Sequence, residues 1–316
     1  MSLAVCRTDV RLGGYMNLKL ATACAGPVLA LAAAFPSITS AAEGGNTQYG
    51  LGSSQFYSGG IPPMRGLYGL SVTGYYSADR LNDGNGDRVP LDFSVRARTQ
   101  TLRLLGVTDQ HILGGRVWGQ LVIPVVVGLD VDAGPMSDSR GGVGDIVVSG
   151  GLTYYKGSHS FVLGIDTALP TGDWDRNRLS NPGQNHVSIQ PTFGYGYLNR
   201  ADPKWEFAAS VRYIVNLENS DTNYTSGNEL VVDYAVGYHF GPVRAAIVGY
   251  YLNQLTDDDG PGVGPDGNRG KGFAIGPSLT YDLSPSTQLS ISYQKETMAE
   301  NKARGDNIML HLSAKF

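Results

Sequence analysis

Charged side chains recur at alternate positions in segments whose other residues are mostly apolar. Arg96 and Arg98 form one such pair, and Asp130 and Asp132 form another. Residues two apart lie on one face of a β-strand, so each pair presents two like charges on the same side. Opposite charges on neighbouring strands would form ion pairs or narrow a polar path. The candidate residues of this kind are Arg96, Arg98, Asp130, Asp132, Asp166, Glu206, Arg212, Glu229, Asp233 and Arg244.

Two other motifs have the residue types for chemistry, but each is incomplete. His186 and Ser188 have the spacing of a hydrolytic pair on one strand face, without the rest of a lipid-hydrolase motif. The acidic stretch 257–268 has Pro261 where a calcium loop has a ligand, and Asn268 in place of the closing Glu. We therefore expect no enzyme, no cofactor and no dedicated metal site.

The elements that hold the charged residues are predicted to be β-strands, because apolar and polar residues alternate with a period of two. The alternation is clearest in the second half, where Leu230 and Val232 oppose Glu229 and Asp233. Twelve strands are predicted, at residues 67–80, 92–105, 113–132, 143–156, 158–170, 186–198, 205–218, 227–240, 243–256, 270–283, 286–298 and 306–316.

The connections between these strands predict how the sheet closes. Short connections, such as 241–242, alternate with longer polar ones, such as 171–185, and aromatic residues cluster at the strand ends beside the short ones. This layout is typical of an outer-membrane barrel. The fold class is thus predicted to be all-β: a transmembrane antiparallel β-barrel of about twelve strands, with up-and-down topology, over residues 67–316. The ten charged residues would face its lumen, because exposure of charge to lipid costs several kcal/mol.

Both ends of the chain predict the same location. The sequence ends on Phe316 after Ile308, Leu310 and Leu312 at alternate positions, a pattern that resembles the C-terminal signal read by the barrel assembly machinery. Residues 1–42 have the basic start, apolar stretch and small-residue cleavage site of a signal peptide, with Met16 as the better start. We expect the mature protein in the outer membrane of a Gram-negative bacterium.

The segment 43–66 lies between the signal peptide and the first predicted strand. It is rich in Gly, Ser and Tyr and is too irregular for a strand. It is either a plug folded into the lumen or a periplasmic tail, and its apolar anchors favour the plug. These anchors are Tyr49, Phe56, Tyr57, Ile61 and Met64.

Several short stretches resemble one known family. They include 76–86, Gly144-Asp145, 169–173, Gln190-Pro-Thr192 and Gly276-Pro-Ser278. From about residue 45 onward the chain is similar to the outer-membrane family named for the meta-pathway of phenol degradation. The resemblance implies passive uptake of small hydrophobic or aromatic compounds. A narrow porin for polar solutes stays open as the alternative, ahead of a lipid hydrolase or an adhesin.

The expected partners follow from this placement. They are outer-membrane lipid and lipopolysaccharide, the assembly machinery and a small hydrophobic solute, and the protein is expected to be a monomer. A formal net charge of −4 without basic clusters argues against nucleic acid. Inside the barrel, the candidate charges either narrow a polar path or form a ladder of ion pairs that fills the lumen, with Arg96 and Arg98 against Asp130 and Asp132 as the expected constriction.

Overall fold

The computed structural model describes residues 42–316, except 46 and 200. All but the last residue of the predicted signal peptide, Met16 included, lies outside the described residues. No helix in the described part of the chain is long and apolar enough to span a membrane. The elements are η1 (Glu43–Gly45), η2 (Gln55–Ser58), β1 (Gly66–Leu81), β2 (Phe93–Ile112), β3 (Gly115–Ala133), β4 (Met136–Val143), β5 (Val147–Lys156), β6 (His159–Ala168), β7 (Ser188–Leu198), β8 (Trp205–Asn216), β9 (Glu229–Phe240), β10 (Val243–Gln254), β11 (Lys271–Ser284), β12 (Thr287–Glu300) and β13 (Ala303–Lys315).

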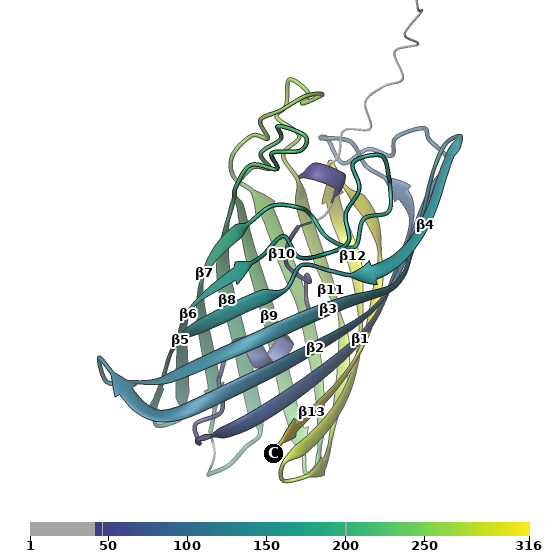
Figure 1. Cartoon of the computed structure of the whole chain (residues 1–316). Helices are drawn as coiled ribbons and strands as arrows, with labels where there is room; N and C mark the ends of the chain where they lie inside the picture. The colour runs from purple at the N-terminus through teal and green to yellow at the C-terminus, as the bar shows by residue number, and fades with distance from the viewer. Residues whose placement is uncertain (1–41, 46, 200) are drawn as a thin grey trace, which may run out of the picture. The chain divides into compact units, whose positions relative to one another are not determined.

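The strands form one closed antiparallel ring (Figure 1). β1 pairs with β13 from Tyr68↔Lys315 to Leu81↔Ala303, and this pairing closes the barrel. β4 and β5 are successive pieces of one stave, because β3 pairs with β4 at one end and with β5 at the other. The ring therefore has twelve staves, and the predicted fold class is confirmed.

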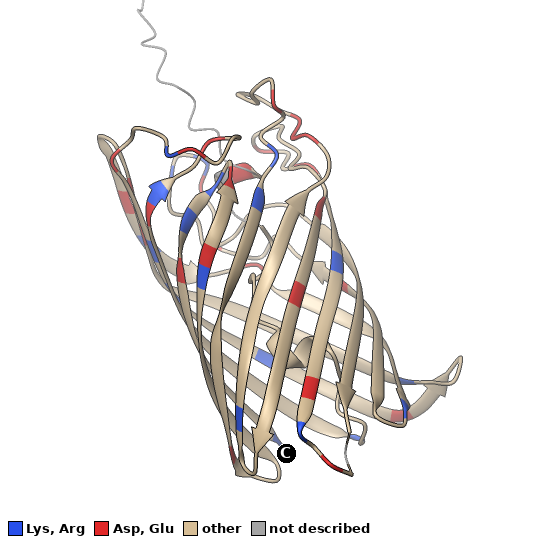
Figure 2. Cartoon of the chain, turned by 180° about the vertical axis from the view of Figure 1, so that it is seen from behind, with Lys and Arg blue, Asp and Glu red and all other residues tan. Residues whose placement is uncertain are grey.

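The two ends of the barrel differ, and we name them by their connections. The loop end carries the connections 82–92, 169–187, 217–228 and 255–270; the turn end carries 113–114, 157–158, 199–204, 241–242, 285–286 and the C-terminus. Charged positions of the strands gather toward the loop end (Figure 2).

Three predicted connections are wrong. The segment 106–112 is part of β2, which continues to a two-residue turn at Leu113 and Gly114, both with positive φ. Two positive φ angles match the right-handed twist of a hairpin, so the strands extend to the turn itself. The segment 133–142 is mostly β4, and 299–305 shrinks to the turn 301–302. These three segments were predicted to be loops because they contain polar residues.

The strand faces follow the predicted alternation in the second half of the chain. Leu279 and Ile291 are 51% and 50% exposed, whereas the adjacent Ser278 and Ser290 are each 4% exposed. The apolar set faces outward, and the small polar set faces a filled interior. An outward apolar face with an inward polar face is the pattern of a membrane barrel.

Residues 47–64 run through the interior of the ring. This segment packs against three apolar clusters of the inner wall, which lie at successive levels along the barrel. Tyr49 and Leu51 pack against the first, Phe56 belongs to the second, and Ile61 belongs to the third beside Trp118. Met64 is 59% exposed, so its prediction as an anchor is wrong. The core of this protein therefore lies between the wall and the N-terminal segment.

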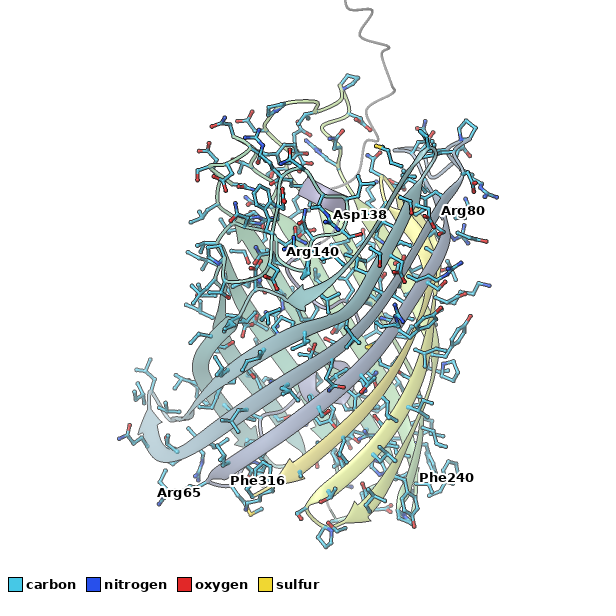
Figure 3. All side chains as sticks on the ribbon, turned by 45° about the vertical axis from the view of Figure 1, so that its right-hand side comes forward. Arg65, Arg80, Asp138, Arg140, Phe240 and Phe316 are labelled. Atoms are coloured by element: carbon cyan, nitrogen blue, oxygen red, sulfur yellow. The ribbon has the colours of Figure 1, made fainter. Side chains whose placement is uncertain are left out.

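The C-terminal aromatic carries a testable prediction. Phe316 is 75% exposed and its backbone N–H donates to Leu67 O at 2.9 Å, so ring closure does not use the side chain. Phe316→Ala should lower the amount of protein in the outer membrane several-fold while leaving refolding in detergent unchanged. Phe240→Ala, which removes another exposed aromatic at the turn end (Figure 3), is the matched control and should change neither quantity. Equal membrane yields for the two variants would contradict the assembly-signal interpretation.

Candidate functional site: the occupied lumen

Six of the ten candidate charged residues lie on the inner face of the wall. Each is on a strand whose outward neighbours are apolar and exposed, and each has polar partners inside. They are Asp166, Glu206, Arg212, Glu229, Asp233 and Arg244. They come from β6, β8, β9 and β10, which lie within five successive strands of the ring (β6 to β10), so the charges lie on one side of the lumen.

The central group joins the wall to the N-terminal segment through Arg212. Its guanidinium forms an ion pair with Asp166 and donates to Gln190 Oε1 at 3.0 Å. The same guanidinium lies 4.3 Å from the centre of the Tyr49 ring, a cation–π distance. The Tyr49 hydroxyl donates to Asp233. One chain of contacts thus runs from β6 through β8 and Tyr49 to β9.

Asp233 also receives two backbone hydrogen bonds from the N-terminal segment. Gly52 N–H and Ser54 N–H each donate to its carboxylate at 3.2 Å. A buried carboxylate needs several donors to offset its desolvation, and here the donors come from this segment. Asp233 therefore holds residues 49–54 in place.

A second group repeats this design nearer the turn end. Arg244 forms an ion pair with Glu206, which also lies 2.9 Å from His239 Nε2. The Arg244 guanidinium lies 3.7 Å from the centre of the Phe56 ring. Toward the loop end, Thr47 Oγ1 donates to Glu229 at 2.7 Å. Aromatic rings of the segment thus stack on arginines of the wall at two levels.

Glycines allow close backbone contact between the segment and the wall. A Cβ built on Gly194 would collide with the Ser58 carbonyl oxygen, and one built on Gly59 would lie 2.6 Å from Tyr195 O. Ser160 Oγ donates to Gly59 O at 2.6 Å from the neighbouring strand. Residues 58–59 therefore fit the wall only while position 194 lacks a side chain.

Four candidate residues lie on the outer face, and the predicted constriction is wrong. Arg96 and Arg98 share their face with Leu102 and Leu104, which are 50% and 46% exposed. On β3 the ladder skips Val127, and this extra residue reverses the faces beyond it.

Because of this reversal, Asp130 and Asp132 also face outward. Arg98 does pair with Asp130, at 3.2 Å, but outside the barrel. Outward charge is tolerated here because the pair lies toward the loop end, beyond the apolar band.

Sequence reasoning missed two inward cations, Arg103 and Lys302. Arg103 alternates with Leu102 and Leu104, so the same parity that places Arg96 outward places Arg103 inward. Lys302 lies in the turn between β12 and β13 and pairs with Glu296 at 2.5 Å. The inward position of Lys302 was not predicted, because residues 299–305 were expected to form a solvated loop.

The alternative motifs are not assembled as catalytic or metal sites. His186 contacts Gln184 O and Asn216 Oδ1, whereas Ser188 Oγ contacts Gln48 and Gln190. In the described ranges, then, no hydrogen bond joins this histidine and serine. In the acidic stretch, Asp257 pairs with Arg269 at 2.6 Å, so its carboxylate is occupied.

The free edge of β4 is covered by the connection 169–187. Among the described strands, β4 pairs with β3 alone, and residues 144–146 interrupt the stave before β5 begins. Asp138 accepts two hydrogen bonds from Arg178, at 3.0 and 2.6 Å, and the backbone N–H groups of Leu179 and Ser180 donate to it at 3.1 and 3.0 Å. Asp138 lies at the loop end (Figure 3). This connection replaces a missing neighbouring strand.

This contact predicts a pH-dependent loop. The Arg178 hydrogen bonds, followed by that from Ser180, lower the pKa of Asp138 to about 2. The carboxyl of an unfolded Asp titrates at about pH 3.9, so the contact stabilises the loop fully above that pH and is lost as the pH falls toward 2. The normalised exchange protection of the Leu179 and Ser180 amides should therefore fall between pH 4 and pH 2.

The Asp138→Asn variant should show low protection of these amides already at pH 7. Asp257→Asn, which breaks an ion pair in a different loop, is the control and should leave them protected. Protection that stays constant down to pH 2 in the unmodified chain would refute the role of Asp138.

Comparisons with known proteins show the family of the chain and solved structures with a similar fold. Residues 78–312 match the model of the family described as "Putative MetA-pathway of phenol degradation". An outer-membrane channel from Pseudomonas putida F1 superposes with a TM-score of 0.72 at 18% identity, over 82% of this chain and 98% of that one. The β-domain of the Bordetella autotransporter BrkA reaches only 0.48 at 11% identity, over 80% and 100% of the two chains. No curated protein matches the sequence.

Proposed function

Because the chain belongs to this phenol-degradation family, we propose that it is an outer-membrane channel for passive uptake of small hydrophobic or aromatic compounds. The fold it shares with the Pseudomonas putida channel supports the location and the channel class. The solute class rests on a property of the lumen. Most of its buried charges, Arg103 excepted, are satisfied by one another and by residues 47–64, so few polar groups remain to replace the hydration shell of a polar solute.

Within this proposal, residues 43–66 are a plug. The observation that carries the assignment is the set of hydrogen bonds to Asp233, which come from three residues of the segment. A periplasmic tail would have no reason to place donors around a buried carboxylate. The plug favours a solute path that leaves the lumen sideways, and the interruption at 144–146, covered by the connection 169–187, is the place in the wall that fits such an exit.

The surroundings of the barrel are proposed from the same features. The closed ring needs no strand from another chain, which supports a monomer. Assembly by the barrel assembly machinery would use the terminal strand. Arg96 and Arg98 face outward toward the loop end, where lipopolysaccharide headgroups would meet them.

The test compares an apolar and a polar solute in cells with an intact outer membrane. Cells that express the protein should take up radiolabelled toluene faster than cells that lack it, with no change for arabinose. A rise for arabinose alone would replace this proposal with the narrow porin. Phospholipid release, rather than uptake, would favour the hydrolase, although His186 and Ser188 have other partners.

A further inference from the structure

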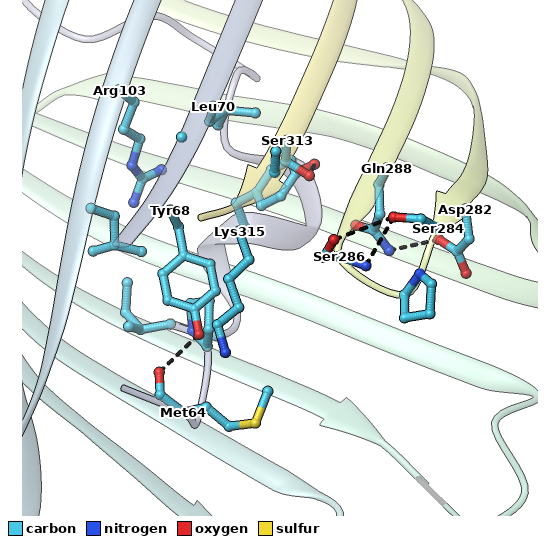
Figure 4. A pocket seen from close by; sticks show the side chains of 18 residues that line it. Met64, Tyr68, Leu70, Arg103, Asp282, Ser284, Ser286, Gln288, Ser313 and Lys315 are labelled. Carbon is cyan, nitrogen blue, oxygen red and sulfur yellow. Dashed lines mark hydrogen bonds between the residues drawn. The ribbon is translucent and has the colours of Figure 1, made fainter. Parts of the chain in front are cut away.

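A cavity of about 570 Å³ lies between the plug and the turn end of the barrel (Figure 4). Its upper wall is made by the plug through Tyr57, Ile61 and Pro62, and its side wall includes Leu70 and Leu105 from β1 and β2. Small-molecule sites have volumes of about 300–1,000 Å³ and mostly apolar linings with a few polar groups. The cavity therefore has the size and character of a binding site for one small solute.

Two cations line this cavity without an ion-pair partner among the described residues. Arg103 uses Nε to donate to Gln120 Oε1 at 2.5 Å, which leaves its two terminal amino groups unengaged among the described residues. Lys315 Nζ lies 5.8 Å from the centre of the Tyr68 ring. Across the described part of the chain, no carboxylate lies within ion-pair distance of either cation. By contrast, Arg212 and Arg244 on the inner face of β8 and β10 are both paired.

The one acid of the cavity wall lies far from Arg103. Cross-strand pairing places Arg103, Leu70, Ser313, Gln288 and Asp282 at one level, in that order, on five successive strands. Four strand spacings separate the first from the last, roughly 19 Å along the wall. Asp282 already accepts a hydrogen bond from Gln288 Nε2 at 2.8 Å. It therefore forms no ion pair with Arg103. Asp166, which accepts from Gln120 Nε2 at 3.3 Å, does act on Arg103, but it is paired with Arg212.

Lys315 lies on the same side of the cavity as Arg103. It pairs with Tyr68, which is two residues nearer the turn end than Leu70 on β1. Figure 4 shows the Arg103 and Lys315 side chains on either side of the Tyr68 ring, whose hydroxyl donates to Met64 O at 2.8 Å. An anion placed beside Tyr68 would meet both cations, with apolar side chains around the rest of the molecule.

We propose that this cavity binds a small organic acid, an aryl or alkyl monocarboxylate, with its carboxylate at Arg103 and Lys315 and its apolar body against Ile61, Leu70 and Leu105. The planar guanidinium offers two donors that match a carboxylate, and the ammonium adds a second charge. This inference rests on the proposed channel function and narrows the solute from apolar compounds in general to those with one carboxylate. The site lies between the plug and the turn end, so a solute bound there would be close to the turn end of the barrel.

The test measures binding of two probes of equal size to the full exported protein in lipid nanodiscs. Fluorine NMR titration with 4-fluorobenzoate and 4-fluorobenzyl alcohol compares an anion with its uncharged counterpart. We expect tighter binding of the anion. Arg103→Gln and Lys315→Gln should each weaken 4-fluorobenzoate binding by roughly tenfold to a hundredfold, the loss expected for a charge-assisted hydrogen bond, and leave the alcohol unchanged.

The matched control is Arg98→Gln, which removes an arginine from the outer face of the same strand. It should leave both affinities unchanged. Arg103→Lys keeps the positive charge but loses the two parallel donors of the guanidinium, so it should bind 4-fluorobenzoate more tightly than Arg103→Gln but less tightly than the unmodified protein. Heat-modifiable migration of each variant establishes that its barrel is folded before its affinity is compared.

The outcomes separate this inference from the proposed function. Equal binding of the two probes, or benzoate binding that survives both substitutions, overturns the carboxylate site, and toluene uptake would then still support the channel. Benzoate binding that depends on Arg103, together with no uptake of any solute, would keep the site and reject the channel. Binding of 4-fluorobenzoate that Arg98→Gln weakens equally would mean non-specific attraction and would also overturn the site.

Discussion

Deletion of residues 43–64 should convert a barrel of low, intermittent conductance into one that conducts steadily in a planar bilayer. The segment occupies the lumen at three levels and stacks on Arg212 and Arg244. A twelve-stranded ring is wider than the eight-stranded barrels whose side chains alone fill the interior, so the emptied lumen should hold water. Single-channel recording of the refolded protein with and without the segment measures this directly.

A single substitution should reproduce part of this effect. Gly194→Val places a side chain where the Ser58 carbonyl oxygen lies, so it should displace residues 58–59 from the wall and raise the open probability. Gly272→Ala is the control, because its added Cβ would meet nothing nearer than 3.5 Å. Steady conductance in the unmodified protein would contradict the plug. Silence after deletion would mean that wall side chains alone close the lumen.

The second large effect is expected for Arg212→Met, which should destabilise the barrel by about 3–5 kcal/mol. The Asp166 and Arg212 side chains are only 6% and 11% exposed, so the substitution leaves a buried carboxylate without its counter-charge. It also removes the cation that stacks on Tyr49. Reversible urea unfolding in lipid vesicles gives the free energy of unfolding.

Two further variants test the electrostatic cause. Arg98→Met breaks a pair whose side chains are 56% and 36% exposed, and it should cost no more than about 1 kcal/mol. The double variant Asp166→Leu with Arg212→Met removes both charges and should recover much of the lost stability. If the double variant is instead as unstable as Arg212→Met, the loss of stability comes from the lost packing of the arginine and not from the unpaired carboxylate of Asp166.

The sequence predicts the ring well and the first half of the lumen poorly. On β8 and β9, lipid-facing and lumen-facing residues alternate without interruption, so Glu206, Arg212, Glu229 and Asp233 could be placed from parity alone. The first half breaks two assumptions. Charges were assumed to face inward along the whole strand, which fails for Arg96 beyond the apolar band.

The alternation on β3 also breaks where the ladder skips Val127, and no sequence signal marks that position. The consistent parity of Leu102 and Leu104 would have identified Arg103 as the inward residue of β2.

The sequence left open whether residues 43–66 form a plug or a tail, because the residues that contact this segment lie far from it along the chain. Tyr49 and Phe56 indicate that the segment needs an apolar environment, and nothing more. The partner of Tyr49 is Asp233, 184 residues away along the chain. Such a contact depends on where the closed ring brings β9, which the sequence near either residue does not encode.

The placement of residues 47–64 also sets an order of events in biogenesis. Ser53 O accepts from His311 Nε2, and these residues are 258 positions apart, near opposite ends of the described chain. The segment is synthesised before every strand it touches, yet its seat is complete only when β13 has joined β1. Contacts of such long range form late, because loop closure comes first. Residues 47–64 should therefore be the last part of the described chain to reach their final position, although they are made before the strands, and they should be open to proteases until the ring has closed.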